Sequence, residues 1–240
     1  MKRMFMMIAV ATCCLATVAL AETTVVGFDD GDDGGFSGNA FFEASGGNPG
    51  GTAHHLALIF FNVLRTGGVG EPVNESFVRD YSSYSSVTFS FDIKTNSLTD
   101  FIGNPIVRSI GVSLMDRDNE GPSGPAGVFF ELGLVSEAAN PDWMTYSITI
   151  DDPMATELPA GWIGFGDEDP NTFEPVLPEG VTFADVLAGV DQFEITGAVP
   201  GFFYTDANFD VLIDNVTVTV EEGSVRTETT SWSSVKAEFK

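Results

Sequence analysis

Apolar and polar residues alternate with a period of two along much of the chain. The runs 87–93 and 146–150 follow this pattern without interruption, which is typical of a strand with one buried and one solvated face. Further runs rich in β-branched and aromatic residues are 25–28, 40–44, 56–61, 106–115, 128–135, 191–196 and 209–220. Clusters of Gly, Pro, Asn and Asp separate them. The sequence therefore predicts an all-β fold, an antiparallel β-sandwich of the jelly-roll type.

One segment, TFADVLAGV, departs from this period. Its apolar residues recur at i, i+3, i+4 and i+7, as Phe183, Val186, Leu187 and Val190. This spacing places side chains on one face of an α-helix. Thr182 is a suitable N-cap, and Asp185 follows it at the spacing of a capping box. We expect one short surface helix whose apolar side lies on the sandwich.

The first residues of the chain have the features of an export signal. Two basic residues, Lys2 and Arg3, precede a mostly apolar run, and Ala19-Leu20-Ala21 fits a signal-peptidase site. The run is short for a membrane span, so we expect residues 1–21 to be a secretory signal peptide. The mature protein is then expected to be secreted or associated with the cell envelope, in the extracellular or periplasmic space, without a membrane span.

The rest of the chain divides into a domain and a tail. Residues 22–222 are predicted to form one β-sandwich domain, and residues 223–240 a polar C-terminal tail. In the tail, Trp232, Val235 and Phe239 recur at i, i+3 and i+7, enough for a short amphipathic helix. Two interpretations stay open: the tail packs on the domain, or it docks to envelope or export machinery.

Charge and cysteine content restrict the function further. The chain has 35 acidic and 10 basic residues and a formal net charge of −25 at pH 7. Such an acidic protein repels DNA and RNA, so we exclude nucleic acid as a partner. Acidity suits solubility in salt or the binding of divalent cations. Both cysteines, Cys13 and Cys14, lie in the expected signal peptide, so the mature protein has no disulfide.

An acidic, glycine-rich loop, GFDDGDDGGFSGN, follows the first predicted strand. Its four carboxylates are Asp29, Asp30, Asp32 and Asp33. An EF-hand loop that began at Asp29 would need ligands at positions 3 and 12, where Gly31 and Ala40 stand. In a β-sandwich, however, calcium can be held by a turn together with a distant strand. A calcium site is one interpretation of the loop, and a solvated turn is the other.

The last predicted strand, FDVLIDNVTVTV, contains a candidate distant ligand. Asp214 has the parity of the apolar residues Leu212 and Val216, whereas Ile213 has the opposite parity. In a regular strand Asp214 would face the apolar side, which is costly for a carboxylate without hydrogen bonds or a metal. The alternative is a β-bulge at Asp214 and Asn215. Both interpretations make this dipeptide unusual.

A second acidic segment, DRDNEG, is a weaker metal candidate in a predicted hairpin. Asp116, Asp118 and Glu120 take positions 1, 3 and 5 of an EF-hand loop. Gly127 stands at position 12, where the bidentate glutamate belongs. The match therefore covers only the first half of the motif.

Signatures of catalysis are sparse, so we expect a non-catalytic protein. His54 and His55 are the only histidines, and as neighbours on a strand they would point to opposite faces. No nucleophile elbow, zinc-protease motif or phosphate-binding loop occurs. Paired carboxylates of a glycoside hydrolase stay open, although Glu131 and Glu194 each stand alone in the sequence.

Aromatic residues offer a second route to a ligand. Exposed rings can stack on the flat faces of sugars, and the candidates are Tyr81, Tyr84, Trp162 and Tyr204. We expect Tyr81 and Tyr84 to be exposed, because serines surround them in RDYSSYSS. The alternative for any of these rings is burial in the core.

The order of several motifs resembles a known family. FDDGDDGGFSGN, GGNPGG, YSSVTFSFDI, WMTYSITI, TFADVLAGVDQFEI and FDVLIDNVTV follow one another as in secreted bacterial domains related to the laminin B (laminin type IV) domain. These are jelly-roll sandwiches similar in shape to carbohydrate-binding modules. The resemblance covers roughly 25–220. It implies a non-catalytic extracellular module, with a structural calcium that joins Asp29 or Asp30 to Asp214.

Three functions follow as expectations. The first is a secreted module that binds a polysaccharide or an extracellular matrix component, with calcium as a structural ion. The second is a structural or adhesive cell-surface protein without a small ligand. The third is a glycoside hydrolase or lyase.

Overall fold

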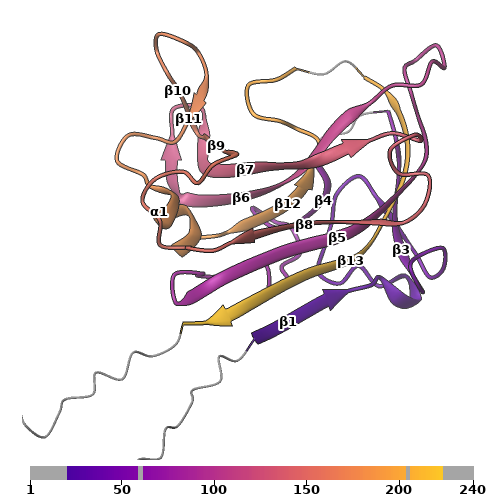
Figure 1. Ribbon diagram of the computed structural model, residues 1–240, viewed down its shortest axis with the longest axis horizontal. Coiled ribbons are helices and arrows are strands. Elements are labelled where there is room, and N and C mark those ends of the chain that lie inside the picture. Colours follow the sequence, from indigo (N-terminus) through magenta and orange to yellow (C-terminus); the bar gives the residue numbers. More distant parts are fainter. Residues whose placement is uncertain (1–20, 59–61, 204–205, 224–240) are drawn as a thin grey trace, which may run out of the picture.

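A computed structural model describes residues 21–58, 62–203 and 206–223 of the protein. Its regular elements are short helices and antiparallel strands (Figure 1): β1 (Ala21–Val26), η1 (Asp29–Gly31), β2 (Phe41–Glu43), β3 (Thr52–Ala57), β4 (Asn62–Gly67), β5 (Tyr84–Thr99), β6 (Arg108–Gly121), β7 (Gly124–Val135), β8 (Met144–Ile150), β9 (Trp162–Phe165), β10 (Asp167–Glu168), β11 (Pro175–Val176), α1 (Phe183–Ala188), β12 (Gln192–Thr196) and β13 (Asn208–Glu222). The expected signal peptide before Ala21 and the tail beyond Gly223 lie outside the described residues.

Two sheets face each other (Figure 1). The six-stranded sheet has the order β2-β3-β13-β5-β8, with β1 also paired to β13. The five-stranded sheet has the order β4-β12-β6-β7-β9, and β10 and β11 form a separate small ribbon. Every pairing is antiparallel: β1–β13, β10–β11, β12–β4, β12–β6, β13–β3, β13–β5, β2–β3, β5–β8, β6–β7 and β7–β9. The prediction of an all-β antiparallel sandwich is confirmed.

Strand β13 changes its buried parity halfway along. Phe209, Val211 and Ile213 are buried before the change, and Val216 and Val218 are buried after it. The register with β5 shifts between Asp214 and Thr217, and Asn215 has a φ of 50°. An extra residue in one strand of a pair is a β-bulge. The bulge is therefore the correct one of the two interpretations of this strand.

Aromatic side chains join the two sheets. Phe89 of β5 stacks on Phe193 of β12, with ring centroids 5.1 Å apart. Phe77 and Phe36 pack against Phe193 at 5.2 and 6.4 Å, and all four rings are buried. Burial of large aromatic surfaces is a strong stabilising contribution, and it holds this cysteine-free domain together.

Helix α1 forms where the sequence predicts it. The backbone N–H of Asp185 donates to Thr182 Oγ1 at 3.2 Å, and the N–H of Thr182 donates to Asp185 Oδ2 at 2.8 Å, so the capping box is complete. Phe183 is buried and meets the ring of Trp162 at 5.4 Å. The helix lies on the sandwich through its apolar side, as expected.

Some strand boundaries differ from the predictions. The start predicted for the strand over 56–61 is wrong: β3 begins four residues earlier and spans 52–57. Strand β4 was not predicted from the sequence, since Val63, Leu64 and Thr66 are all buried and leave no alternating pattern. The acidic segment DRDNEG is not a hairpin turn; it lies inside β6, and the turn joins Gly121 to Gly124.

Candidate functional site

Two segments far apart in sequence meet at the bulge of β13. Strand β1 pairs with β13 as far as Val26 opposite Val216, and β3 pairs with it from Ala53 opposite Ile213. Asp214 lies between these two pairings. The segment 27–31 follows β1 and the loop 44–51 precedes β3. Asn48 of this loop donates its backbone N–H to Asp214. We call the place where Asp29, Asn48, Asp92, Asp214 and Asn215 meet the acidic junction.

Asp214 is the central carboxylate of the acidic junction. Its side chain is 0% exposed. Oδ2 accepts a hydrogen bond from the backbone N–H of Asn48 at 2.5 Å, and Oδ1 accepts from that of Asn215 at 2.7 Å. Burial raises the pKa of Asp214, and the nearby charges of Asp92 and Asp29 add to the increase. The carboxylate is therefore fixed in place but not neutralised by a basic side chain.

Asp92 is a further member of the acidic junction, which the sequence interpretation missed. It stands directly opposite Asp214 on β5. Its Oδ2 accepts hydrogen bonds from Asn48 Nδ2 at 3.0 Å and Asn215 Nδ2 at 2.9 Å, and its Oδ1 accepts from Thr145 Oγ1 at 2.5 Å. Asp92 is 9% exposed, but it keeps the regular alternation of FSFDI, so the sequence carries no local signal for it.

Oxygen atoms converge beside Gly27. A Cβ atom placed on Gly27 would have Asp214 Oδ1 at 3.7 Å and both Asn215 Oδ1 and Asp29 Oδ2 at 3.8 Å. Asp29 Oδ1 accepts from the backbone N–H of Gly51 at 3.2 Å, which ties the first loop to the second. Carboxylate and amide oxygens of this kind are the donors that calcium prefers. The chemistry of these residues fits a calcium ion.

The other acidic residues of the first loop serve the loop itself. Asp32 Oδ1 accepts from the N–H of Gly34 at 2.7 Å, and Asp33 Oδ1 accepts from that of Gly35 at 2.8 Å. Asp30 is exposed within η1 and has a φ of 59°. Hydrogen bonds from a carboxylate to an N–H two residues on are typical of turns. Of the four aspartates, Asp29 is the one whose carboxylate lies beside Asp214.

The second acidic segment forms a local hydrogen-bonded bulge. Asp116 is buried, and its Oδ1 accepts from the N–H of Asp118 at 2.9 Å. Its Oδ2 accepts from Asn119 Nδ2 at 2.6 Å. Asp118 and Glu120 are exposed. The buried carboxylate is thus satisfied by its own neighbours.

The described residues contain neither a cluster of metal-ligating side chains nor a helix that could cross a membrane. No group of three or more His, Cys, Asp or Glu side chains comes together as a metal site within 21–58, 62–203 and 206–223. The acidic junction would therefore have to use amide and carbonyl oxygens besides its carboxylates. In the same part of the chain, no helix has the length and apolarity needed to cross a membrane.

The predicted aromatic platform is largely absent. The expectation that Tyr81 is exposed is wrong: it is 0% exposed, and its hydroxyl donates to the carbonyl oxygen of Phe77 at 2.9 Å. Trp162 is 8% exposed and packs on Phe130 at 5.3 Å, so little of its ring is accessible. Tyr84 is half-buried, with the Arg79 guanidinium 4.9 Å from its ring centroid.

Tyr204 lies outside the described residues. The exposed aromatic side chains of the described residues are all phenylalanines: Phe41, Phe101, Phe173, Phe202 and Phe203. In the sequence, Phe202 and Phe203 belong to the aromatic run GFFY, of which Tyr204 is the predicted ligand-binding candidate.

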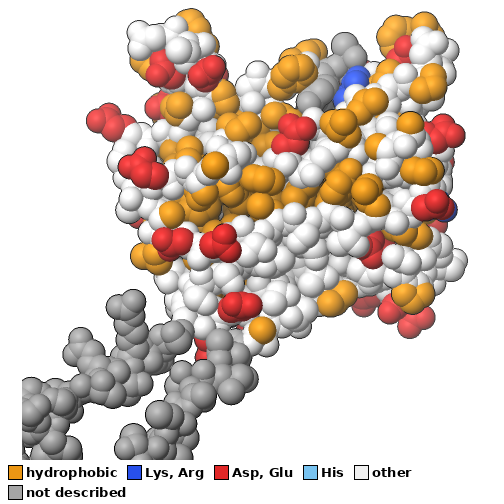
Figure 2. Space-filling model, viewed as in Figure 1, with side chains coloured by type: hydrophobic (Ala, Val, Ile, Leu, Met, Phe, Trp, Pro, Cys, Tyr) orange, Lys and Arg blue, Asp and Glu red, His pale blue; other side chains and the backbone are white. Residues whose placement is uncertain are grey.

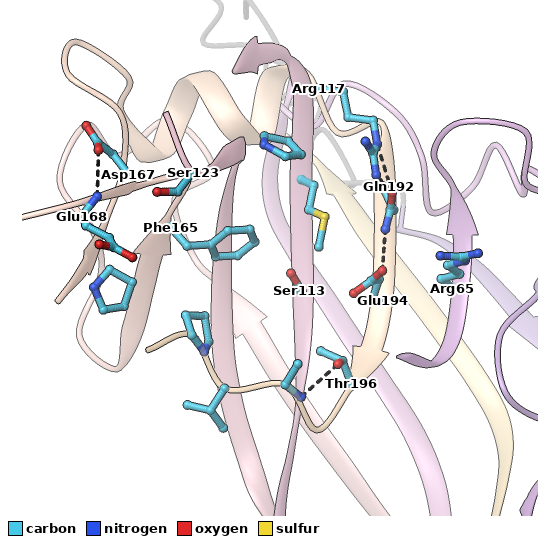
Figure 3. A pocket seen from close by; sticks show the side chains of 17 residues that line it. Arg65, Ser113, Arg117, Ser123, Phe165, Asp167, Glu168, Gln192, Glu194 and Thr196 are labelled. Carbon is cyan, nitrogen blue, oxygen red and sulfur yellow. Dashed lines mark hydrogen bonds between the residues drawn. The ribbon is translucent and has the colours of Figure 1, made fainter. Parts of the chain in front are cut away.

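A groove on the five-stranded sheet is the second candidate site, which we call the sheet groove (Figure 3). Its volume is about 510 Å³. Arg65 of β4, Glu194 of β12 and Ser113 of β6 stand in one row, because the register pairs Glu194 with both of the others. Their neighbours Leu64, Ile195 and Leu114 are buried in the core. The row therefore faces away from the core, on the outer side of the sheet.

Hydrogen bonds orient the polar side chains of the sheet groove (Figure 3). Arg117 donates through Nε at 3.0 Å and Nη2 at 2.5 Å to Gln192 Oε1. Gln192 Nε2 in turn donates to Glu194 Oε1. Burial raises the pKa of Glu194, against the lowering effects of the Gln192 hydrogen bond and of the Arg65 and Arg117 charges.

Two polar atoms of the sheet groove have no partner among the described residues. Ser113 Oγ and Arg65 Nε are both buried without a hydrogen bond, and Ser113 as a whole is 2% exposed. A buried polar atom without a partner costs about 1–3 kcal/mol, which a ligand that supplies the missing bond recovers. Beside this row, the side chains of Met115 and Phe165 provide an apolar lining.

Comparisons with known proteins place no family on the chain. No family model matches it, and no curated protein matches it. Among solved structures it is similar to one titled "Structural analysis of an exo-beta-agarase", with a TM-score of 0.46 and 12% sequence identity. The match covers 82% of this chain and 25% of that one, so the chain spans about a quarter of its length. We therefore derive the function from the residues of the two sites.

Proposed function

We propose that this protein is a secreted or envelope-associated β-sandwich module that binds a glycan without cleaving it, with calcium as a structural ion. The observation that carries the proposal is the sheet groove, where Ser113 Oγ and Arg65 Nε are buried without a partner. Ligand sites combine a mainly apolar cavity of about 300–1,000 Å³ with a few convergent polar groups. The sheet groove, at about 510 Å³, falls in this range.

The donors and acceptors of the sheet groove suit hydroxyl-bearing ligands. Ser113 can donate and accept, Arg65 Nε can only donate, and an ionised Glu194 can only accept. A sugar presents hydroxyl groups that play both roles, and its C–H faces match apolar side chains such as Met115 and Phe165. A polysaccharide or a glycosylated matrix component therefore fits better than a purely apolar ligand.

Calcium has a structural role in this proposal. In the acidic junction, burial raises the pKa of Asp214, and the charges of Asp92 and Asp29 add to the increase. A bound calcium ion supplies positive charge that offsets this repulsion. It would connect the turn after β1, through Asp29, to the bulge of β13, through Asp214 and Asn215.

A glycan array with the purified protein tests the binding role. We expect binding to at least one polysaccharide, weakened about tenfold or more by Ser113→Ala or Glu194→Gln, since both change the row that would contact the ligand. The matched control is Ser147→Ala, an exposed serine of β8 on the other sheet. Binding lost in all three variants would indicate general damage.

The alternative functions give different results in the same experiment. Absence of binding to every glycan, with and without calcium, would contradict the proposal and favour the structural or adhesive role. Release of reducing ends from a bound polysaccharide would instead reveal a hydrolase or lyase.

A further inference from the structure

Two of the few basic side chains of the described residues line the sheet groove, although the protein is strongly acidic. Figure 2 shows acidic side chains scattered over the visible face and very little basic surface. Only five basic side chains belong to the described residues: Arg65, Arg79, Lys94, Arg108 and Arg117. Two of them, Arg65 and Arg117, line the sheet groove. Solubility does not require two arginines at one site, so we ask what these side chains bind.

Arg117 forms no ion pair with a carboxylate in the part of the chain that the structure describes. Its guanidinium donates twice to the amide oxygen of Gln192 and forms no ion pair with a carboxylate of the described residues within 4.0 Å. Its backbone N–H, by contrast, donates to Asp191 Oδ2 at 2.9 Å. The two bonds to Gln192 fix the guanidinium plane, and its remaining N–H groups stay available. A planar guanidinium is well suited to the bidentate binding of a carboxylate or a sulfate-like group.

Arg65 is used differently. Its Nη2 is paired with Glu71 Oε1, and Ser37 Oγ holds the second oxygen of Glu71 at 2.7 Å. This charge is therefore compensated, but Nε remains a buried donor without a partner. Arg65 thus supplies a hydrogen bond to the groove, whereas Arg117 supplies a positive charge that has no ion-pair partner among the described residues.

The two walls of the sheet groove differ in charge, as Figure 3 shows. Arg117 stands on one side with Arg65, Gln192 and Glu194, and the two carboxylates of Asp167 and Glu168 of β10 stand on the other. An anionic substituent would be attracted to the Arg117 wall and repelled by the β10 wall. Carboxylates accept hydrogen bonds from hydroxyl groups, so the β10 wall suits the uncharged part of a sugar. The groove can therefore orient a ligand with one anionic end.

Resting on the proposed function, we propose that the sheet groove selects a glycan that carries an anionic substituent, a carboxylate or a sulfate ester, which the Arg117 guanidinium binds. The ring hydroxyl groups bond to Ser113 Oγ, Arg65 Nε and Glu194. The apolar face of the ring contacts Met115 and Phe165. The long-range field of a protein with net charge −25 opposes this binding, but at physiological salt it is screened beyond about 8 Å, so the local contact decides selectivity.

Two pairs of polymers test the proposal, because the members of each pair share a backbone and differ in whether it carries an anionic group. The first is polygalacturonate and its methyl ester, and the second is dextran sulfate and dextran. Binding is measured by affinity electrophoresis and calorimetry at 0.15 M salt. We expect the charged member of at least one pair to bind about tenfold or more tightly than its neutral partner; the pair that shows the preference identifies the anion as a carboxylate or a sulfate.

Variants assign the preference to its residue. Arg117→Gln is expected to reduce binding of the charged polymer to that of the neutral one. Lys94→Gln removes the same charge from β5, outside the groove, and is expected to leave the preference unchanged. Melting curves of both variants check that the fold is intact. If both variants lose the preference for the charged polymer to the same extent, the net charge and not the groove sets that preference. This result would overturn the proposal.

The outcomes separate this proposal from the function on which it rests. If the protein binds polysaccharides but prefers neutral ones, or shows no preference within either pair, the anionic selection is wrong and glycan binding stands. If it binds no glycan on the array and none of the four polymers, both are wrong.

Discussion

Calcium should stabilise this protein through the acidic junction, and Asp214→Asn should abolish the effect. In the native state the Asp214 carboxylate is fully buried, with Asp29 and Asp92 close enough to raise its pKa. Unfolding separates the three charges and destroys the site, so the ion binds the native state alone. Asn keeps the shape of the side chain but removes the charge that an ion would neutralise.

The size of the effect follows from mass action. An ion that binds only the native state adds about 2.7 kcal/mol of stability at a concentration one hundred times its dissociation constant. For a domain of 150–250 residues, each kcal/mol shifts the melting temperature by about 2–4 °C. We therefore expect the melting temperature of the natural protein to be roughly 5–10 °C higher in calcium than in EDTA.

Differential scanning calorimetry in calcium and in EDTA measures this shift for each variant. The quantity to compare is the calcium-dependent difference, because any cost of a substitution that is the same in both solutions cancels. Asp214→Asn should show no difference, whereas Asp118→Asn, at an exposed residue of the other acidic segment, should keep most of it. A melting curve of the natural protein that is the same in calcium and in EDTA would refute the calcium site.

Three further predictions concern pH, packing and the independence of the two sites. Burial raises the pKa of the Glu194 carboxyl, so the protonated side chain favours the folded state. This stabilisation is present below the unfolded pKa, near 4.5, and is lost as the pH rises through the folded pKa. Glu194→Gln should therefore unfold at a higher denaturant concentration than the natural protein at pH 7, and at a similar concentration at pH 4. Phe193→Ala removes a ring packed between both sheets and should cost about 3–5 kcal/mol in urea unfolding, whereas Phe173→Ala, at an exposed loop, should cost less than about 0.5 kcal/mol. Glycan affinity measured well below the melting temperature should be equal in calcium and in EDTA, and a large loss in EDTA would place the ion at the ligand.

The acidic junction could be predicted in part because its central residue disturbs a strong local pattern. Apolar residues of opposite parity flank Asp214, so a bulge or a buried charge was already required by the sequence. Asp92 was harder to identify: it alternates correctly with the apolar residues of β5, and only the pairing with β13 brings it opposite Asp214. Local patterns reveal irregular backbone, but not which strand lies beside it.

The sheet groove could not be predicted, because its polar row is assembled by register across three strands. Arg65, Ser113 and Glu194 come from three strands that are far apart in the sequence, and β4 itself has no alternating pattern. The prediction that Tyr81 is exposed also fails because of a contact with a distant segment. Its serine-rich neighbours favour exposure, but the backbone N–H of Tyr81 bonds to the carbonyl oxygen of Leu187 at 2.9 Å, and this contact from the end of α1 draws the ring into the core.

The positions of the two sites explain why an ion at one should act on stability and not on recognition. Asp92 alternates with the core residues Phe91 and Ile93, so the acidic junction lies on the outer side of the six-stranded sheet. Glu194 and Ser113 lie on the outer side of the other sheet, and the stacked rings of the core separate the two. A dense core holds its shape when a distant loop loosens. Loss of the ion would therefore loosen the connection of β1 and β3 to β13 while the row on β4, β12 and β6 keeps its register.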